Sequence, residues 1–214
     1  MKRFIAILLL AFAGSAHPAE RFANYKAYIA QAIGKPYTSL EVHAAEAFSP
    51  KGRVVFGIAH DAWRFSGDET GIVFIMRELK NDAVEEVARS KLFPLPNPNG
   101  KLYVNSVDAQ SAKRFSITIN FHGTCGDGMD TYRFALVGKD WLVTGLDSER
   151  YECDDGDEAM GDARTEKSSN FLTGRITEKT YRKNRLVKSQ QSKKQFPKFP
   201  LSDFAVFDER HGRP

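Results

Sequence analysis

The sequence has few cysteines and few histidines, which limits the metal sites and catalytic sites that it can form. Its 214 residues include 2 Cys and 5 His. Two cysteines cannot form an all-cysteine zinc site or hold an iron–sulfur cluster. The catalytic patterns Gly-x-Ser-x-Gly and His-Glu-x-x-His are missing, as is a glycine-rich phosphate loop ahead of a helix. The sequence therefore carries no enzyme signature, and a non-catalytic role is favoured.

A strong excess of one charge is missing too. The formal net charge is +4, from 31 Lys+Arg and 27 Asp+Glu, which is far below that of a dedicated nucleic-acid-binding protein. No nucleic-acid partner is therefore predicted. The chain is not short of apolar bulk, because 42% of its residues are hydrophobic and 16 are Phe. That composition excludes a fully disordered chain.

Long apolar runs are also missing, apart from a short one at the start. Met1-Lys2-Arg3 precedes apolar residues 4–12, and small residues follow. This is the pattern of a secretory signal peptide, and the run is about half as long as a bilayer-spanning helix requires. We expect a signal peptide over residues 1–19, cut after Ala16 or Ala19. The mature protein would then be periplasmic or secreted, with no transmembrane span.

The remaining residues, 20–214, predict a single mainly β domain with one N-terminal packing helix. Apolar residues at helical spacing predict the helix over residues 21–33, which Gly34 and Pro36 end. Period-two alternation or apolar β-branched runs predict the strands. They cover residues 54–58, 71–79, 101–107, 113–122, 131–137, 141–146, 165–172 and 175–188. Short turns join them, which favours an antiparallel sheet or sandwich of hairpins.

The two cysteines, Cys125 and Cys153, are predicted to form a disulfide. Exported chains rarely keep two free thiols, and a bridge would close a loop that stabilises the fold by about 3.5 kcal/mol in the chain-entropy model. The alternative is a nucleophilic Cys125 activated by His122. An oxidised sulfur cannot act as a nucleophile, so the structural reading is favoured.

Acidic, glycine-containing segments follow both cysteines. The bridge would hold residues 126–130 and 154–158 at one end of the sheet. Flexible oxygen-rich loops suit Ca²⁺, although the spacing differs from that of an EF-hand loop. The calcium candidates are Asp127, Asp130, Asp154, Asp155, Asp157 and Glu158. A solvated acidic rim or a contact surface for a basic partner is the alternative, and no other cofactor is predicted.

Two further stretches resemble a known group of proteins. Trp141-Leu-Val-Thr-Gly-Leu-Asp147 followed by Ser169-Asn-Phe-Leu-Thr-Gly-Arg175 is similar to a pattern in uncharacterised exported bacterial β-rich proteins. Residues 64–71, Arg-Phe-Ser-Gly-Asp-Glu-Thr-Gly, resemble a degenerate integrin-like, calcium-binding FG-GAP element, in which Arg64 replaces the first carboxylate. The resemblance implies a β-rich fold and an exported location, and it implies no reaction.

His122 is the best single candidate for an acid–base or metal role. It ends a predicted strand on the polar face, beside the first acidic segment. Histidine titrates near neutral pH and binds metals readily. A strand-end histidine that bonds a loop carbonyl is the more ordinary outcome.

A basic segment spans residues 175–198 and holds nine basic residues and one acidic residue, Glu178. Such a run suits anionic envelope material, including phospholipid head groups, lipopolysaccharide and teichoic polymers. The expected contact residues are Arg182, Lys183, Arg185, Lys188, Lys193 and Lys194. An apolar stretch over residues 201–207 is expected to dock on the body, which would confine the basic segment to a loop.

These observations favour an exported, non-catalytic binding protein of the cell envelope. One concrete version is an inhibitor or immunity-type protein against an envelope-acting enzyme, which would use the two cysteine loops as its contact edge. A periplasmic hydrolase using His122 and nearby carboxylates is one alternative. The other is a structural protein that its basic segment holds at the envelope.

Overall fold

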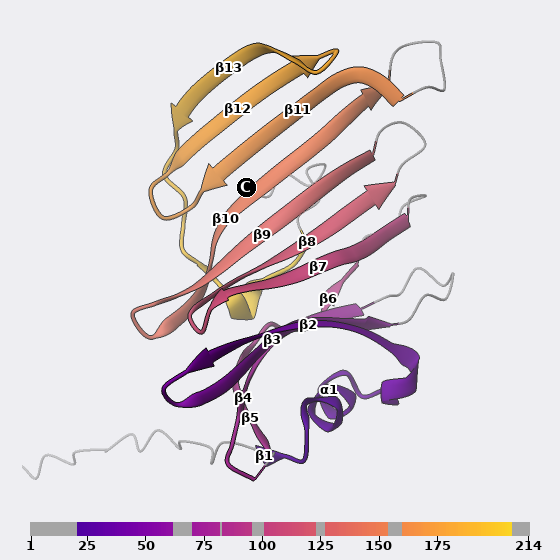
Figure 1. The fold of residues 1–214 in the computed structure, drawn as a ribbon, viewed down its shortest axis with the longest axis vertical. Coiled ribbons are helices and arrows are strands. Elements are labelled where there is room, and N and C mark those ends of the chain that lie inside the picture. Colours follow the sequence, from indigo (N-terminus) through magenta and orange to yellow (C-terminus); the bar gives the residue numbers. More distant parts are fainter. Residues whose placement is uncertain are drawn as a thin grey trace, which may run out of the picture.

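A computed structural model describes residues 21–61, 70–81, 83–95, 101–122, 127–153 and 160–206. It contains two antiparallel β-sheets and one short α-helix (Figure 1), which confirms the predicted mainly β fold and is consistent with a sandwich. Among the described residues, no helix combines the length and apolar character that crossing a membrane would need.

The smaller sheet has the order β1-β5-β4-β3-β2, and β6 pairs with β4. Its strands are β1 (Arg21–Phe22), β2 (Leu40–Ser49), β3 (Gly52–Asp61), β4 (Thr70–Glu78), β5 (Val84–Arg89) and β6 (Phe93–Pro94). The central strands β3 and β4 are buried over most of their length. Both faces of this sheet are covered, which explains why these two strands are continuous apolar runs.

The larger sheet is a meander in which each strand pairs with its neighbours in the chain, and β14 pairs with the start of β10. Its strands are β7 (Lys101–Ser111), β8 (Arg114–His122), β9 (Asp127–Val137), β10 (Asp140–Cys153), β11 (Met160–Asn170), β12 (Arg175–Arg182), β13 (Arg185–Lys193) and β14 (Phe199–Pro200). The edge strand β7 lies against β2 of the smaller sheet (Figure 1).

The helix α1 (Tyr25–Ile33) covers the outer face of the smaller sheet. The Asn24 side chain accepts a hydrogen bond from the Ala27 N–H, and Gly34 ends the helix at φ 71°. The predicted start at residue 21 is wrong, because Arg21–Phe22 pairs with β5 as a short strand. Two 3₁₀ turns, Tyr37–Ser39 and Leu201–Asp203, complete the described elements.

The main core lies between the two sheets and is rich in aromatic rings. Phe115 of β8 stacks on Phe56 of β3 with ring centroids 4.7 Å apart and on Phe134 of β9 at 4.5 Å. The C-terminal segment closes this core with buried Leu201 and Phe204. The predicted docking of that segment is confirmed by these contacts.

The predicted single strand over residues 175–188 is wrong, and the basic segment is not a loop. Lys183 and Asn184 both have positive φ angles, 50° and 58°. Two consecutive left-handed residues make the type I′ turn that joins tight hairpins, and Asn favours it. The chain therefore reverses between β12 and β13, which form the outer edge of the larger sheet.

Tyr28→Phe is expected to make the free energy of unfolding fall less steeply as the pH rises above 10. Tyr28 belongs to α1, and its phenol is buried against the smaller sheet. This burial, together with the Glu86 carboxylate, raises its pKa. A group whose pKa is raised on folding contributes stability below its unfolded pKa of about 10 and loses it as pH rises further. Urea unfolding from pH 9 to 11.5 should show a steeper decline in the wild type. Tyr25→Phe on the same helix should retain the wild-type slope, and an equal slope in the Tyr28 variant would contradict the assignment.

Candidate functional site

One face of the larger sheet is polar and open, because its strands alternate between core and outward positions. Along β9, Tyr132 and Phe134 enter the core, whereas Thr131 and Arg133 point to the opposite face. There the Thr131 hydroxyl lies 3.1 Å from that of Thr118, and an Arg133 nitrogen lies 2.8 Å from an Asp147 oxygen. The face therefore carries paired polar groups from neighbouring strands.

The charges at the middle of this face largely satisfy one another. The Tyr151 hydroxyl donates to Glu149 at 2.6 Å, and Arg164 donates to the same carboxylate at 3.2 Å. Arg164 also lies 2.9 Å from Glu166 and sits over the Tyr181 ring at 4.6 Å. The Glu149 carboxylate raises the pKa of Tyr151 by accepting its proton in a hydrogen bond. These charges are engaged with one another, and the second carboxylate leaves the network with a net negative charge.

Two depressions lie over this network. One, of about 380 Å³, is lined by Asp147, Glu149, Glu166 and Lys179 among others. The other, of about 240 Å³, includes Tyr103 and Asn120. The lining of the first mixes carboxylates with lysines, whereas the lining of the second holds Asp127 and Glu149 and no basic side chain. Neither lining is free of acidic groups.

A third depression, of about 690 Å³, lies at the base of the β12–β13 hairpin and differs in charge. Its lining is Asn170, Thr173, Arg175, Gln191, Ser192 and Lys193. Arg175 and Lys193 face each other across the two strands in register. The lining holds two cations, four neutral polar side chains and no carboxylate, which suits an anion.

The hairpin above this depression is basic and exposed; we call residues 175–194 the basic hairpin. It holds eight basic residues and one acidic residue. Every residue of β13 is exposed, and β12 is only half-buried. Within the described ranges, none of its eight cations forms an ion pair, whereas Arg53, Arg77 and Arg150 in the body all do. The predicted contact residues therefore share one exposed edge.

The predicted disulfide and most of the calcium candidates fall outside the described residues. These are Cys125, Asp154, Asp155, Asp157 and Glu158, together with most of the FG-GAP-like stretch, residues 64–69. His122 and Cys153 end β8 and β10, and His122 pairs in register with Asp127 at the start of β9. The disulfide, the calcium site and a role for His122 stay predictions.

Asp130 is a calcium candidate whose side chain is held in an ion pair. It is buried, and its carboxylate lies 2.8 Å from an Arg150 guanidinium nitrogen. Arg150 also donates to the Met129 carbonyl at 3.2 Å and covers the Phe121 ring at 5.1 Å. In this arrangement the Asp130 charge is balanced by an arginine.

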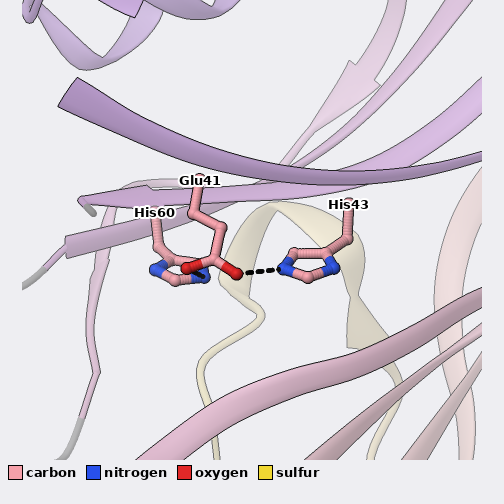
Figure 2. Close-up of side chains that lie close together, drawn as sticks. All are labelled: Glu41, His43 and His60. Atoms are coloured by element: carbon pink, nitrogen blue, oxygen red, sulfur yellow. Dashed lines mark hydrogen bonds and ion pairs between the residues drawn. The ribbon is translucent and has the colours of Figure 1, made fainter. Parts of the chain in front are cut away.

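A second cluster, which the sequence interpretation did not identify, joins Glu41, His43 and His60 (Figure 2). Glu41 and His43 lie two residues apart on β2, and Glu41 pairs in register with His60 on β3. The three side chains therefore project from the same face of the hairpin. Their nearest potential ligand atoms all lie within 4.8 Å of one another.

The pairing register of β2 and β3 could have identified this cluster from the sequence. The turn after Ser49 pairs Ser49 with Gly52, and counting back along both strands brings Glu41 opposite His60. That count requires β2 to be recognised as a strand. Its sequence, Leu-Glu-Val-His-Ala-Ala-Glu-Ala-Phe-Ser, is rich in Ala and Glu, which have low β-propensity.

The resemblance to exported bacterial β-rich proteins stays a prediction. Trp141 and Asp147 both lie within β10, and Gly145 follows a bulge in the pairing with β9. The predicted strand end at residue 146 is wrong, because β11 pairs with β10 from Gly145 to Cys153 and extends it. No protein-family model, no curated protein and no solved structure matches the chain.

Proposed function

We propose that this chain is an exported, non-catalytic protein that binds phosphate head groups of cell-envelope lipids through its basic hairpin. The observation that carries the proposal is the acid-free depression between Arg175 and Lys193, which continues into a strand pair whose cations form no ion pair with other described residues. The expected signal peptide supports an envelope location. The fold offers a rigid sheet from which the hairpin extends.

The basic hairpin does not contribute side chains to the hydrophobic core. No residue of β12 or β13 belongs to either hydrophobic cluster of the described chain, and β13 pairs only with β12. Figure 1 shows β13 at the edge of the larger sheet that is farthest from α1. Lysines on an edge strand also discourage edge-to-edge aggregation. Aggregation control alone would not require a cation pair lining an acid-free depression.

Charge at the hairpin tip supplies the long-range attraction in this proposal. Lys183 lies in the type I′ turn, Arg182 and Arg185 flank that turn, and Lys188 follows on β13. Each basic residue near an anionic lipid surface contributes about 1 kcal/mol at moderate salt. Arg175 and Lys193 would then hold an individual phosphate, because arginine forms bidentate hydrogen bonds with phosphate oxygens.

Neutralising Lys183, Arg185 and Lys188 with glutamine is expected to weaken binding to anionic vesicles by about 100-fold. Three lost cations correspond to about 3 kcal/mol, and each 1.4 kcal/mol is tenfold in affinity. Co-sedimentation with vesicles of phosphatidylglycerol and phosphatidylcholine measures this effect. Pure phosphatidylcholine vesicles should bind neither protein.

The matched control replaces Lys51, Lys80 and Lys139 with glutamine, since these lysines are exposed and lie away from the hairpin. It carries the same change in net charge and should bind nearly as the wild type does. A separate Arg175→Gln and Lys193→Gln variant should weaken binding while keeping the charged tip. Equal losses in the control and tip variants would show that only net charge matters, and would refute a specific role for the hairpin.

A further inference from the structure

We infer that Glu41, His43 and His60 form a binding site for one zinc ion at the end of the β2–β3 hairpin. This inference is independent of the lipid-binding proposal, because the cluster lies on the smaller sheet and shares no residue with the basic hairpin. It rests on the proton position and burial of His60 and on the spacing of the three ligand atoms.

The tautomer of His60 is fixed by its backbone neighbour. His60 Nδ1 lies 3.0 Å from the carbonyl oxygen of Asp61, and a carbonyl can only accept a hydrogen bond. Nδ1 therefore carries a proton. A neutral His60 then presents a bare lone pair on Nε2, and hydrogen bonding of the other ring nitrogen to a carbonyl is the usual support of a metal-bound histidine.

The lone pair on His60 Nε2 is buried and lacks a hydrogen-bond partner among the described residues. The side chain of His60 is only 4% exposed, and its Nε2 faces Glu41 Oε2 at 3.9 Å. Two acceptor atoms thus confront each other, and the histidine nitrogen is the buried one, which is unfavourable without a positive charge between them. A metal ion or a second proton on His60 would resolve the conflict.

The second histidine favours a metal ion over a proton. His43 Nε2 lies 2.9 Å from Glu41 Oε1, and the two imidazole rings are nearly parallel, with centroids 6.0 Å apart. Both Nε2 atoms are therefore directed to the same carboxylate (Figure 2). In the metal-free geometry His43 Nε2 donates its N–H to Glu41 Oε1, and zinc would take the place of that proton between the two ligand atoms.

The ligand spacing matches a small, nitrogen-preferring cation. Zinc binds His nitrogen and carboxylate oxygen at 2.0–2.2 Å, so neighbouring ligands of a tetrahedral site are about 3.3 Å apart. The two histidine–carboxylate separations, 2.9 Å and 3.9 Å, lie on either side of that value, and all three ligand atoms lie within 4.8 Å of one another. Ca²⁺ and Mg²⁺ prefer oxygen ligands only, whereas two imidazoles and one carboxylate are a familiar zinc set.

The site opens to solvent on the glutamate side. The Glu41 side chain is 48% exposed and that of His43 is 25% exposed. Three protein ligands and an accessible fourth position are the arrangement that lets zinc hold a water molecule or a ligand group. The proposed site can thus accept zinc without unfolding of the hairpin.

Zinc titration of the untagged, chelator-treated protein by calorimetry tests the inference. We expect saturable binding of one Zn²⁺ with Kd on the order of 1 μM or below, and no binding of Ca²⁺ to the same residues. His43→Ala and His60→Ala should each weaken the affinity by about 100-fold or more, and Glu41→Gln by about tenfold. His43→Ala and Glu41→Gln change partly exposed side chains, so they remain informative if His60→Ala fails to fold.

A control variant separates this site from adventitious binding. Glu46→Gln removes a carboxylate on the same strand that pairs with Arg53. It should bind zinc as the wild type does. Nitrogen NMR should show Nε2 of His43 and His60 shifting together on zinc addition. Failure to bind zinc, unchanged affinity in the His43 and Glu41 variants, or an imidazolium signal from His60 that zinc does not alter would each overturn the inference.

Discussion

Phe115→Ala is expected to lower the free energy of unfolding by about 3–5 kcal/mol, the usual cost of emptying a buried phenylalanine site. Phe115 is 1% exposed and joins the two sheets, because its ring stacks on Phe56 of β3 and on Phe134 of β9. Trp141 closes the cluster at 5.9 Å. A domain of this size is stable by only about 5–15 kcal/mol, so the loss is a large fraction of the total. Urea unfolding followed by tryptophan fluorescence measures it.

Phe48→Ala is the matched control for that experiment. Phe48 is 81% exposed at the end of β2, and the same substitution there should change stability by less than about 0.5 kcal/mol. Phe115→Leu retains most of the buried area and should cost clearly less than alanine. Equal losses at residues 115 and 48 would mean that the two sheets do not share the core described above.

The larger sheet was predictable from the sequence because each of its inner strands alternates between buried apolar and exposed polar side chains. Phe115, Ile117 and Ile119 are all buried, as the alternation along residues 113–122 predicts. The strand β2 was not predictable in the same way. Its burial is irregular, and its conformation comes from pairing with the apolar strand β3. Local propensity carries little information about such a strand.

The two candidate sites also differ in how far the sequence alone could predict them. The basic residues of the hairpin are concentrated in one short segment of the sequence, so composition alone located them. Their arrangement was not predictable, since the reversal at Lys183 and Asn184 depends on two positive φ angles in one long polar segment. Glu41 and His60 are brought together only by strand register, and no short-range spacing pattern reports that proximity.

The depression at the base of the basic hairpin depends on the same long-range order. Its lining includes Asn170 at the end of β11 and Gln191 and Lys193 on β13. β12 lies between those two strands, so their separation is set by two successive antiparallel pairings. The sequence shows only a polar turn and a basic segment. The pairing registers of β11, β12 and β13 bring them together as an acid-free depression.

Arg150→Met is expected to destabilise the protein by about 3–5 kcal/mol, because it leaves the buried carboxylate of Asp130 without its partner. Asp130 is 1% exposed, and an Arg150 nitrogen lies 2.8 Å from its oxygen. Methionine retains apolar contact with Phe121, so the charge and the hydrogen bonds are what the substitution mainly removes. Chemical unfolding at pH 7 measures the change.

Arg133→Met provides the matched control, because it breaks an ion pair of the same length in a different environment. Arg133 lies 2.8 Å from Asp147, and both side chains are more than a third exposed, so the pair contributes no more than about 1 kcal/mol. Adding Asp130→Asn to Arg150→Met should restore much of the lost stability, because the uncompensated charge is then removed. If the Arg150 and Arg133 variants lose equal stability, burial of Asp130 does not set the cost. If the double variant is no more stable than Arg150→Met alone, the loss comes from the contacts of the guanidinium with the backbone and with Phe121, and Asp130 is not the group that requires an arginine.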